Sequence, residues 1–326
     1  MGQRLFANIR RTCAAIAVTA ASVTGTVTGA AAQDSGFTFD WPDNPFAPTL
    51  SDALFVDTGE ARFEKAGRVI VQSMSGIGSE LGDIASFPAR NPGAFGAFAL
   101  GVGALLLIDE PATKLYQKTF VPIGKKFDLP ELVDIDNLTI DAQYLALGVA
   151  GTYAYGIVAN DERSQVAALL ATKAVAYSYL TSHVILKTAF GRLRPVSDLE
   201  NHTGPTGDFS TSPFNFFNST GVHFDTHPHA TAMPSFHFTM YFSTARVYSG
   251  VYDNYFIPYG IAAALALQSA EGHNHWVSDM VAGALIGTGI GNVILNNYEE
   301  RRGAIDMSFA PIASSKGAGF GFQMTF

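Results

Sequence analysis

The sequence contains a single cysteine, Cys13, among its 326 residues. This residue lies in the apolar N-terminal segment, so the rest of the chain offers no thiol for a disulfide, a cysteine nucleophile or a cysteine-based metal site. Charged residues are also scarce, at 15% of the chain, whereas hydrophobic residues make up 48%. That balance supports a sizeable apolar core and approaches the composition of membrane proteins.

Basic residues are fewer than acidic ones, 20 against 28, which gives a formal net charge of −8. An acidic chain is unsuited to binding nucleic acid, because a phosphate backbone needs clustered cations. The sequence also lacks a glycine-rich phosphate loop and a run of alternating strands. We therefore do not expect an α/β nucleotide-binding fold.

Residues 1–32 have the pattern of a secretory signal peptide. Arg4, Arg10 and Arg11 precede an apolar run rich in Ala and Thr, which ends in three alanines. We expect cleavage after Ala32 and an exported, periplasmic protein, and the Arg10-Arg11 pair leaves a twin-arginine route open. Removal of three arginines and no acidic residue would change the net charge from −8 to −11.

The rest of the chain divides into three parts. Residues 33–92 are expected to form an extended arm and a surface helix over 60–83, with breaks at Pro88 and Pro92. The arm is rich in aromatic residues and prolines, namely Phe37, Phe39, Trp41, Pro42 and Pro45. A helical domain over 93–302 follows. The tail, 303–326, alternates with period two about a turn at 314–317, which predicts a β-hairpin.

The domain over 93–302 is expected to be an all-α bundle of about six core helices. Uncharged or nearly uncharged helices are predicted at 93–108, 142–159, 164–190, 235–250, 255–271 and 275–297, and 109–133 is expected to be a surface helix and loop. Gly283, Gly287 and Gly291 recur every four residues, a spacing that favours close helix packing. Most uncharged runs are shorter than the ~20 residues needed to span a bilayer. We therefore prefer a soluble bundle or one bound to a membrane surface, and an integral membrane protein is the alternative.

Residues suited to phosphate chemistry gather in three clusters. They are Lys187-Thr-Ala-Phe-Gly-Arg192-Leu-Arg194-Pro195, Pro234-Ser235-Phe236-His237 and His275-Trp-Val-Ser-Asp279. All eight histidines of the chain lie between His183 and His275. No other part of the sequence concentrates groups that could perform chemistry.

The spacing within each cluster suggests a role. Lys187 and Arg194 are expected on one face of a helix that ends at Arg194, because a proline follows. Two such cations suit a tetrahedral oxyanion. The Pro-Ser pair predicts a helix start, which would place His237 beside free N–H groups as a proton donor. His275 and Asp279 are four residues apart, so on a helix the carboxylate can orient the imidazole as a nucleophile or base.

At these residues the sequence resembles the type 2 phosphatidic acid phosphatase superfamily, which includes bacterial acid phosphatases and vanadium haloperoxidases. The resemblance extends over roughly residues 93–297 and depends on Lys-x6-Arg-Pro, Pro-Ser-x-His and His-x3-Asp occurring in that order. It implies a helical phosphatase bundle without a cofactor. His275 would form a phosphohistidine, His237 would be the general acid and Asp279 would be the partner of His275.

The same resemblance implies that Lys187, Arg194, Ser235 and the backbone of Phe236 bind the phosphoryl group. Phe236 stands where the family usually has a glycine. A second departure is Gln268-Ser269 in place of a Ser-Arg pair, so the arginine expected six residues before the third-cluster histidine is missing. Its loss would cost the transition state about 2–4 kcal/mol. The candidates to replace it are Arg192, Arg246 and His273. Family branches that transfer phosphoryl groups between lipids also tolerate these departures.

The segment 196–233 is too long for a simple connector, so a lid or binding loop is one interpretation. Its phenylalanines, Phe209, Phe214, Phe216 and Phe217, could line an apolar entrance or could dock the loop onto the bundle. Four residues in alternation raise the question of a metal site: His223, Asp225, His227 and His229. The family chemistry needs no metal and we assign none. His183 is expected to be a packed histidine.

The favoured hypothesis is an exported phosphatase acting on phosphomonoesters, with lipid phosphates and pyrophosphates among the substrates considered. One alternative is a phosphotransferase or a vanadate-dependent haloperoxidase on the same fold. The other is a non-catalytic binder of phosphorylated ligands, which the serine at position 269 makes credible. No oligomeric state follows from the sequence.

Overall fold

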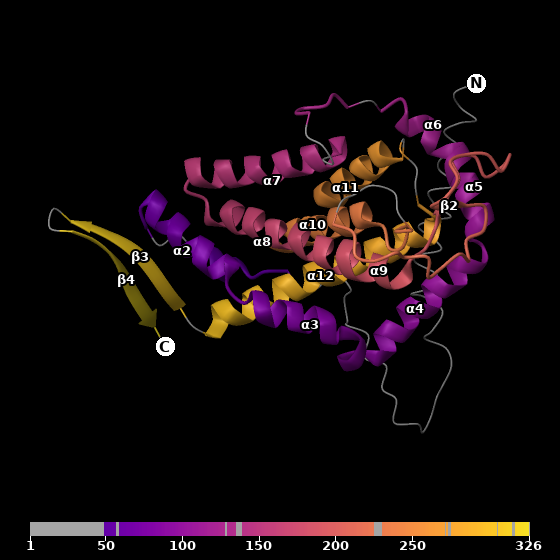
Figure 1. The fold of residues 1–326 in the computed structure, drawn as a ribbon. Helices are drawn as coiled ribbons and strands as arrows, with labels where there is room; N and C mark the ends of the chain where they lie inside the picture. Colours follow the sequence, from indigo (N-terminus) through magenta and orange to yellow (C-terminus); the bar gives the residue numbers. More distant parts are fainter. Residues whose placement is uncertain are drawn as a thin grey trace. The chain divides into compact units, whose positions relative to one another are not determined.

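A computed structural model gives the fold of the chain from residue 49 onward (Figure 1). It describes residues 49–56, 59–127, 129–134, 139–224, 230–270, 272, 275–304, 306–314 and 317–325, and for 303–325 it describes only the backbone. The expected signal peptide and the aromatic positions of the arm lie outside these residues.

The described chain is largely helical, and the expected all-α bundle is confirmed. In chain order the elements are η1 (Asp52–Phe55), α2 (Arg62–Met74), α3 (Ile77–Arg90), α4 (Pro92–Leu107), α5 (Asp109–Thr119), α6 (Val121–Gly124), α7 (Ile140–Val158), α8 (Glu162–Ser178), η2 (Tyr179–Leu186), α9 (Lys187–Phe190), β1 (Arg194–Pro195), β2 (Phe209–Ser210), α10 (Phe236–Tyr252), α11 (Phe256–Ser269), α12 (Val277–Ala304), β3 (Asp306–Ser314) and β4 (Gly317–Thr325).

The first helices differ from the expectation at their boundaries. The sequence predicts one helix over 60–83, but the structure has two, with the break at Gly76, whose φ is 74°. Glycine adopts this left-handed conformation without steric cost. The break expected at Pro88 is wrong, because α3 continues through it to Arg90. Pro88 lies in the last turn, where it removes only one backbone hydrogen bond. Pro92 is the first residue of α4, a position that needs no N–H.

The helix predicted over 164–190 is continuous but not uniform. α8 passes into the π-helical stretch η2, and the single turn α9 then ends at Phe190. Gly191 closes the helix with a φ of 51°. A Cβ atom at this position would lie 2.5 Å from the backbone nitrogen of Ser219, so both the conformation and the space require glycine. Short π-helical stretches are frequent at functional sites, and this one directly precedes Lys187.

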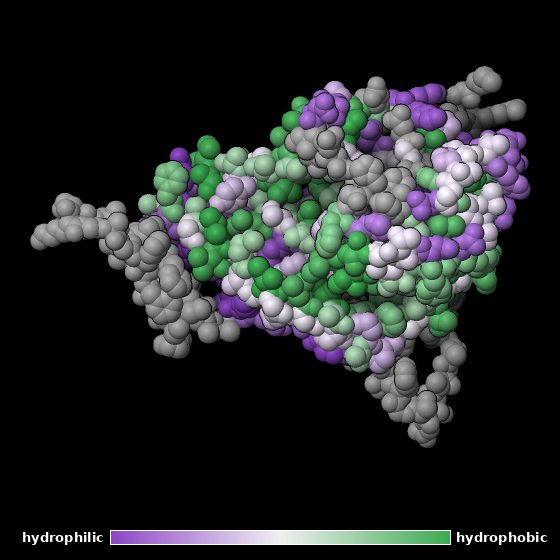
Figure 2. All heavy atoms as spheres, in the orientation of Figure 1, coloured by the Kyte–Doolittle hydropathy of each residue, from purple (hydrophilic) through white to green (hydrophobic). Residues whose placement is uncertain are grey.

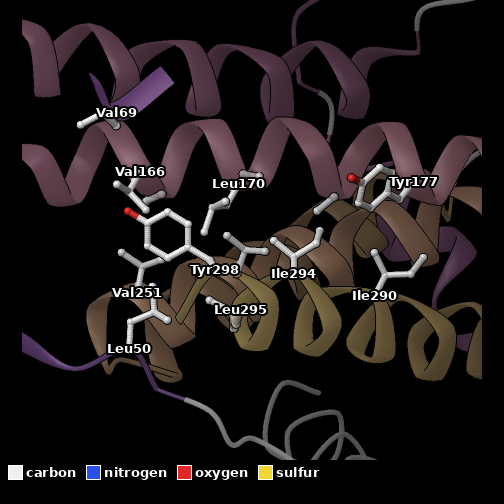
Figure 3. Close-up of a cluster of buried hydrophobic side chains, with 14 residues drawn as sticks. Leu50, Val69, Val166, Leu170, Tyr177, Val251, Ile290, Ile294, Leu295 and Tyr298 are labelled. Carbon is white, nitrogen blue, oxygen red and sulfur yellow. The ribbon is translucent and has the colours of Figure 1, made fainter. Parts of the chain in front are cut away.

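A large part of the apolar core lies between α8 and α12 (Figure 3). Val166 and Leu170 of α8 belong to the same buried cluster as Ile294, Leu295 and Tyr298 of α12. Burying each side chain of this size stabilises the fold by about 1.5–3 kcal/mol. This core fixes α12 along its length and therefore fixes the position of its N-terminus.

Helices α10 and α12 run side by side, and the glycine stripe allows their close approach (Figure 1). A Cβ atom at Gly283 would lie 2.5 Å from the carbonyl oxygen of Ser235, and one at Gly287 would lie 2.3 Å from that of Thr239. Gly291 is packed against α10 in the same way. The glycines therefore serve helix packing, as predicted, and the two helices run parallel with their N-terminal ends together.

The tail forms the predicted hairpin. Strands β3 and β4 pair antiparallel, from Asp306 opposite Thr325 to Ser314 opposite Gly317. The period-two pattern of the sequence was therefore a reliable signal for strands in this part of the chain.

One helix of the described chain, Val277–Arg302, is long and apolar enough to cross a membrane. The window that passes this test is 50% buried. The two segments Pro92–Leu107 and Asp109–Gly124 pass it only when taken together, and they are bent by 74° at their junction. A buried core helix has the same length and composition as a span, and α12 packs against α8 and α10 as such a helix does.

Candidate functional site

The two cations of the first cluster come from different backbone conformations. Lys187 begins α9, and only 4% of it is exposed. The expectation that the helix continues to Arg194 is wrong, because Gly191 ends it earlier. Arg194 instead stands on β1, which pairs in parallel with β2. The two cations therefore do not share a helix face, although the folded chain still brings their charges close together.

The electrostatics of this pair are those of an anion-binding site. Burial lowers the pKa of Lys187 well below its ordinary value, and the neighbouring Arg194 lowers it further. Burial also lowers the pKa of Arg194 to about 10. Within the described part of the chain, no carboxylate or other hydrogen-bond partner contacts the Nζ atom of Lys187. A buried ammonium in this state is stabilised by an anion that reaches it from solution.

The second cluster begins α10. Phe236 is the first helical residue after the cis Met233–Pro234 peptide, so His237 lies in the first turn, as predicted. Backbone N–H groups at this end of a helix favour negative charge. The Nε2 atom of His237 lies 3.3 Å from Oγ1 of Thr139 and 3.8 Å from Oδ2 of Asp141.

The two residues before His237 have different surroundings. The backbone N–H of Ser235 donates to the carbonyl oxygen of Asp279 at 2.9 Å, which ties the second cluster to the third. The Oγ atom of Ser235 is buried, and among the described residues it has no hydrogen-bond partner. The side chain of Phe236 packs edge-on against Tyr179 and His183. His183 also stacks on Tyr179, so it is a packed histidine.

The third cluster lies at the start of α12. His275 precedes the helix by two residues, and Asp279 is the third helical residue. The Nδ1 atom of His275 lies 3.6 Å from Oδ2 of Asp279, an ion-pair separation slightly longer than a hydrogen bond. The same Oδ2 accepts from the backbone N–H of Trp276 at 2.9 Å. Asp279 therefore caps the helix as well as facing the imidazole.

Lys187, Arg194 and both histidines converge on one region. Burial lowers the pKa of His275 well below its ordinary value, and the charges of Arg194, Lys187 and His237 lower it further. Burial also lowers the pKa of His237, opposed by Asp141 and reinforced by Lys187 and Arg194. The charges of Lys187 and Arg194 thus act on both imidazoles, and the charge of His237 acts on His275, so the four groups lie near one another.

Arg192 is bound to carboxylates instead of facing this region. Its Nη1 donates to Asp279 at 2.5 Å, and its Nη2 donates to Asp109 at 2.7 Å. Ser278 donates to Asp109 through both its backbone N–H and its hydroxyl. All these groups are almost fully buried. Arg192 therefore holds the start of α12 against the start of α5, and it does not replace the missing arginine.

Arg246 does not fill that role either. Arg246 donates from Nε to Asn292 at 2.5 Å. It is nine residues beyond His237 on α10, about 13 Å along the axis at 1.5 Å per residue. His273 lies outside the described residues. Position 269 itself is a serine that donates to the carbonyl oxygen of Ala266 at 3.0 Å.

Two carboxylates of this region were missed by the sequence reasoning. Asp109 was assigned to a surface segment, yet it is 1% exposed and bridges Arg192 and Ser278. Asp141 was not singled out, although it lies beside His237 and accepts a hydrogen bond from Tyr241. The available signal was weak: each aspartate stands at the start of a helix, and Asp141 is the one charged residue of α7.

The loop over 196–233 is docked onto the end of the first cluster. The guanidinium of Arg192 lies 4.9 Å from the ring centroid of Phe216, and the backbone N–H of Phe217 donates to Phe190. Phe214 and Phe217 are exposed. Of the four metal candidates, His223 is described and the other three are not, and the described residues contain no group of three metal-binding side chains.

The sequence comparisons agree with this geometry. Residues 165–302 match the family model of the PAP2 superfamily, a segment that runs from α8 to α12 and contains all three clusters. Neither the curated proteins nor the solved structures contain a significant match. Similarity to this superfamily supports a phosphatase-like or haloperoxidase activity in general. The match confirms the resemblance seen in the sequence: residues 165–302 are similar to the PAP2 superfamily.

Proposed function

We propose that this protein is an exported phosphatase that hydrolyses phosphomonoesters through a phosphohistidine intermediate. One observation carries the proposal: Lys187 is buried without a protein counter-ion in contact among the described residues, beside Arg194 and two imidazoles. A phosphoryl group would supply the missing negative charge. A preorganised cationic site of this kind stabilises the charge that develops on the oxygens of the transition state.

In the proposed reaction the lone pair on Nε2 of His275 attacks phosphorus. Nδ1 is the nitrogen that faces Asp279, at 3.6 Å, so Nε2 is available. The bond from phosphorus to the ester oxygen breaks, and His237 gives a proton to that oxygen. The neutral His237 then takes a proton from water, whose oxygen attacks phosphorus and breaks the bond to His275. Phosphate leaves and both imidazoles return to their starting states.

Without an arginine at position 269, the site still has groups that can stabilise the charge of the transition state. Lys187, Arg194 and the N-terminus of α10 remain as sources of positive potential. By comparison with the loss of one oxyanion contact, the site would give up about 3 kcal/mol of transition-state stabilisation. This favours a slow enzyme over a non-catalytic phosphate binder.

Lipid phosphates are the substrates we favour, because several apolar helices of the described chain have exposed hydrophobic side chains. Helix α4 carries no charged residue and buries none of its residues, and Leu100 and Leu107 are 77% and 75% exposed. Figure 2 shows apolar residues gathered over much of one face. A helix that is hydrophobic all round is normally covered by protein or by lipid. This supports a protein attached to a membrane surface on the periplasmic side.

The full chain should release phosphate from an aryl phosphate and from phosphatidic acid in vesicles, and orthovanadate should inhibit both reactions. Halide oxidation on addition of vanadate would favour a haloperoxidase instead. Phosphate binding without turnover would contradict the proposal.

The proposed attachment to a membrane surface is tested by vesicle flotation of a Leu100→Glu, Leu107→Glu double variant. We expect weaker vesicle binding and unchanged turnover of the soluble aryl phosphate. Equal flotation of variant and wild type would contradict attachment through α4.

A further inference from the structure

Two buried polar groups beside His237, Tyr241 and Asp141, are not used in the reaction described above. They lie between His237 and the partly buried Ser269. Tyr241 is only 1% exposed, and its hydroxyl donates to Oδ2 of Asp141. The side chain of Ser269 is near the same hydroxyl, and its own hydroxyl donates to the carbonyl oxygen of Ala266. The Oδ2 atom of Asp141 is 3.8 Å from Nε2 of His237.

These groups come from three helices, and Ser269 stands where the family pattern has an arginine. Ser269 is the last residue of α11, Asp141 is the second residue of α7, and Tyr241 lies on α10. Tyr241 follows His237 by four residues, so the two side chains share one face of α10. Their rings lie 6.2 Å apart between centroids. In this chain, position 269 is thus connected to the general acid.

The charges around His237 have opposite signs on its two sides. Asp141, from α7, favours the protonated imidazole, whereas Lys187 and Arg194 oppose it. His275 also faces His237 through space. Asp141 is the one carboxylate that acts on His237 among the described residues. An acid that must carry a proton beside two cations needs such a carboxylate.

Tyr241 is suited to hold that carboxylate in place. Burial raises the pKa of its hydroxyl well above the ordinary value, and the charge of Asp141 raises it further. The phenol therefore stays protonated and donates to Asp141. A buried, charge-assisted hydrogen bond of this type restricts the carboxylate to one orientation.

On the basis of the proposed phosphatase function, we propose that Asp141 is the positioning residue of His237 and that Tyr241, with Ser269 beside it, orients the Asp141 carboxylate. With Nε2 of His237 facing Asp141 and Thr139, Nδ1 is the nitrogen that donates the proton to the departing oxygen. The Asp141 carboxylate keeps that proton on the ring until the ester bond breaks.

The variants Asp141→Asn and Tyr241→Phe of the full chain test this proposal. Tyr177→Phe is a matched control, because Tyr177 also donates to a buried carboxylate, Glu80, at 2.5 Å, away from the histidines. Turnover should be measured on an alkyl phosphate and on 4-nitrophenyl phosphate, whose leaving group needs little protonation. The titration midpoint of His237 should be followed by NMR, with His237→Gln used to assign its signal.

For Asp141→Asn we expect the midpoint of His237 to fall by about one pH unit. Alkyl phosphate turnover should fall about 100-fold, and 4-nitrophenyl phosphate turnover should fall less than tenfold. For Tyr241→Phe we expect about a tenfold loss in kcat on the alkyl ester with little change in KM. Tyr177→Phe should change neither the midpoint nor the dependence on the leaving group.

An unchanged midpoint in Asp141→Asn, or equal losses on both substrates, would overturn the proposal. The NMR titration needs no turnover, so it tests the pairing even if the wild-type protein hydrolyses neither substrate. In that case the phosphatase function would fail while the pairing of Asp141 with His237 could still be decided.

Discussion

Replacement of Lys187 by methionine should stabilise the protein without ligand and weaken its binding of phosphate analogues. Lys187 is 4% exposed, and both burial and Arg194 disfavour its charged form. Methionine fills a similar volume without that cost. Replacing a buried ion pair by apolar residues often stabilises a protein by about 1–4 kcal/mol, and for this single buried charge we expect a value near the lower end.

The pH dependence of stability provides a second signature. The pKa of Lys187 in the folded protein is depressed below its ordinary 10.5. At a pH between the depressed pKa of the folded state and the ordinary 10.5, the unfolded chain binds more protons than the folded protein does. Stability should therefore rise with pH in that window. This rise should disappear in Lys187→Met, because the titrating group is gone.

The magnitude of the ligand effect follows from mass action. Orthovanadate at about 100 times its Kd should stabilise the wild type by about 2.7 kcal/mol. A shift of about 2–4 °C per kcal/mol gives a rise in Tm of about 5–11 °C. Loss of one charge-assisted hydrogen bond costs about 1.5–3 kcal/mol. At the same vanadate concentration, that loss should remove most of the rise.

A matched control is Lys173→Met. Lys173 is also buried, but its Nζ donates to Glu80 at 2.6 Å and to the carbonyl oxygen of Ser73 at 2.9 Å. Its loss should cost about 3–5 kcal/mol, because it leaves a buried carboxylate without this partner. Differential scanning fluorimetry of both variants, with and without vanadate, measures all of these effects. If Lys187→Met lowers the ligand-free Tm as Lys173→Met does, or keeps the vanadate shift, the reasoning is refuted.

Four further outcomes are expected. His275→Ala should abolish turnover and the acid-labile phosphoenzyme seen after rapid quenching with labelled substrate; a surviving phosphoenzyme would exclude this nucleophile. Activity needs neutral His275 and protonated His237, and the pKa values of both residues lie below 6.5. A pH profile of kcat/KM should therefore peak below pH 6.5 and fall as the pH rises further; a maximum above pH 6.5 would contradict these roles. Arg192→Met should lower the free energy of unfolding in urea by about 3–5 kcal/mol, and an unchanged midpoint would contradict its role between two buried carboxylates. Gly287→Ala should lower Tm, because a Cβ atom would lie 2.3 Å from a backbone oxygen of α10, whereas Gly289→Ala meets open space and should not; equal effects would contradict the packing argument.

Much of the bundle could be predicted because its signals are local. The helices over 142–159 and 255–271, the hairpin in the tail and the packing glycines of α12 follow from periodicity, turn residues and spacing. The three clusters were recognised for a related reason. Their residues are close in sequence and each cluster stands near a helix end, so a short motif carries enough information.

The remaining features depend on contacts between distant segments. The end of α9 was missed because Gly191 adopts a left-handed conformation that the sequence permits but does not require. Arg192 was a candidate to replace the missing phosphate-binding arginine, yet in the folded protein its guanidinium donates to Asp109 and Asp279. Asp141 is 96 residues before His237 in the numbering of the chain, and no motif joins them. Long-range pairing of this kind cannot be read from local spacing.

The carboxylates that support the site lie before the segment that matches the family, which runs from residue 165 to 302. Asp109 anchors the start of α12 through Ser278, and Asp141 faces His237. A fragment trimmed to the family match would keep every motif and lose both anchors. Any minimal active fragment must therefore start upstream of α5, and an inactive shorter one would say nothing about the chemistry of the motifs.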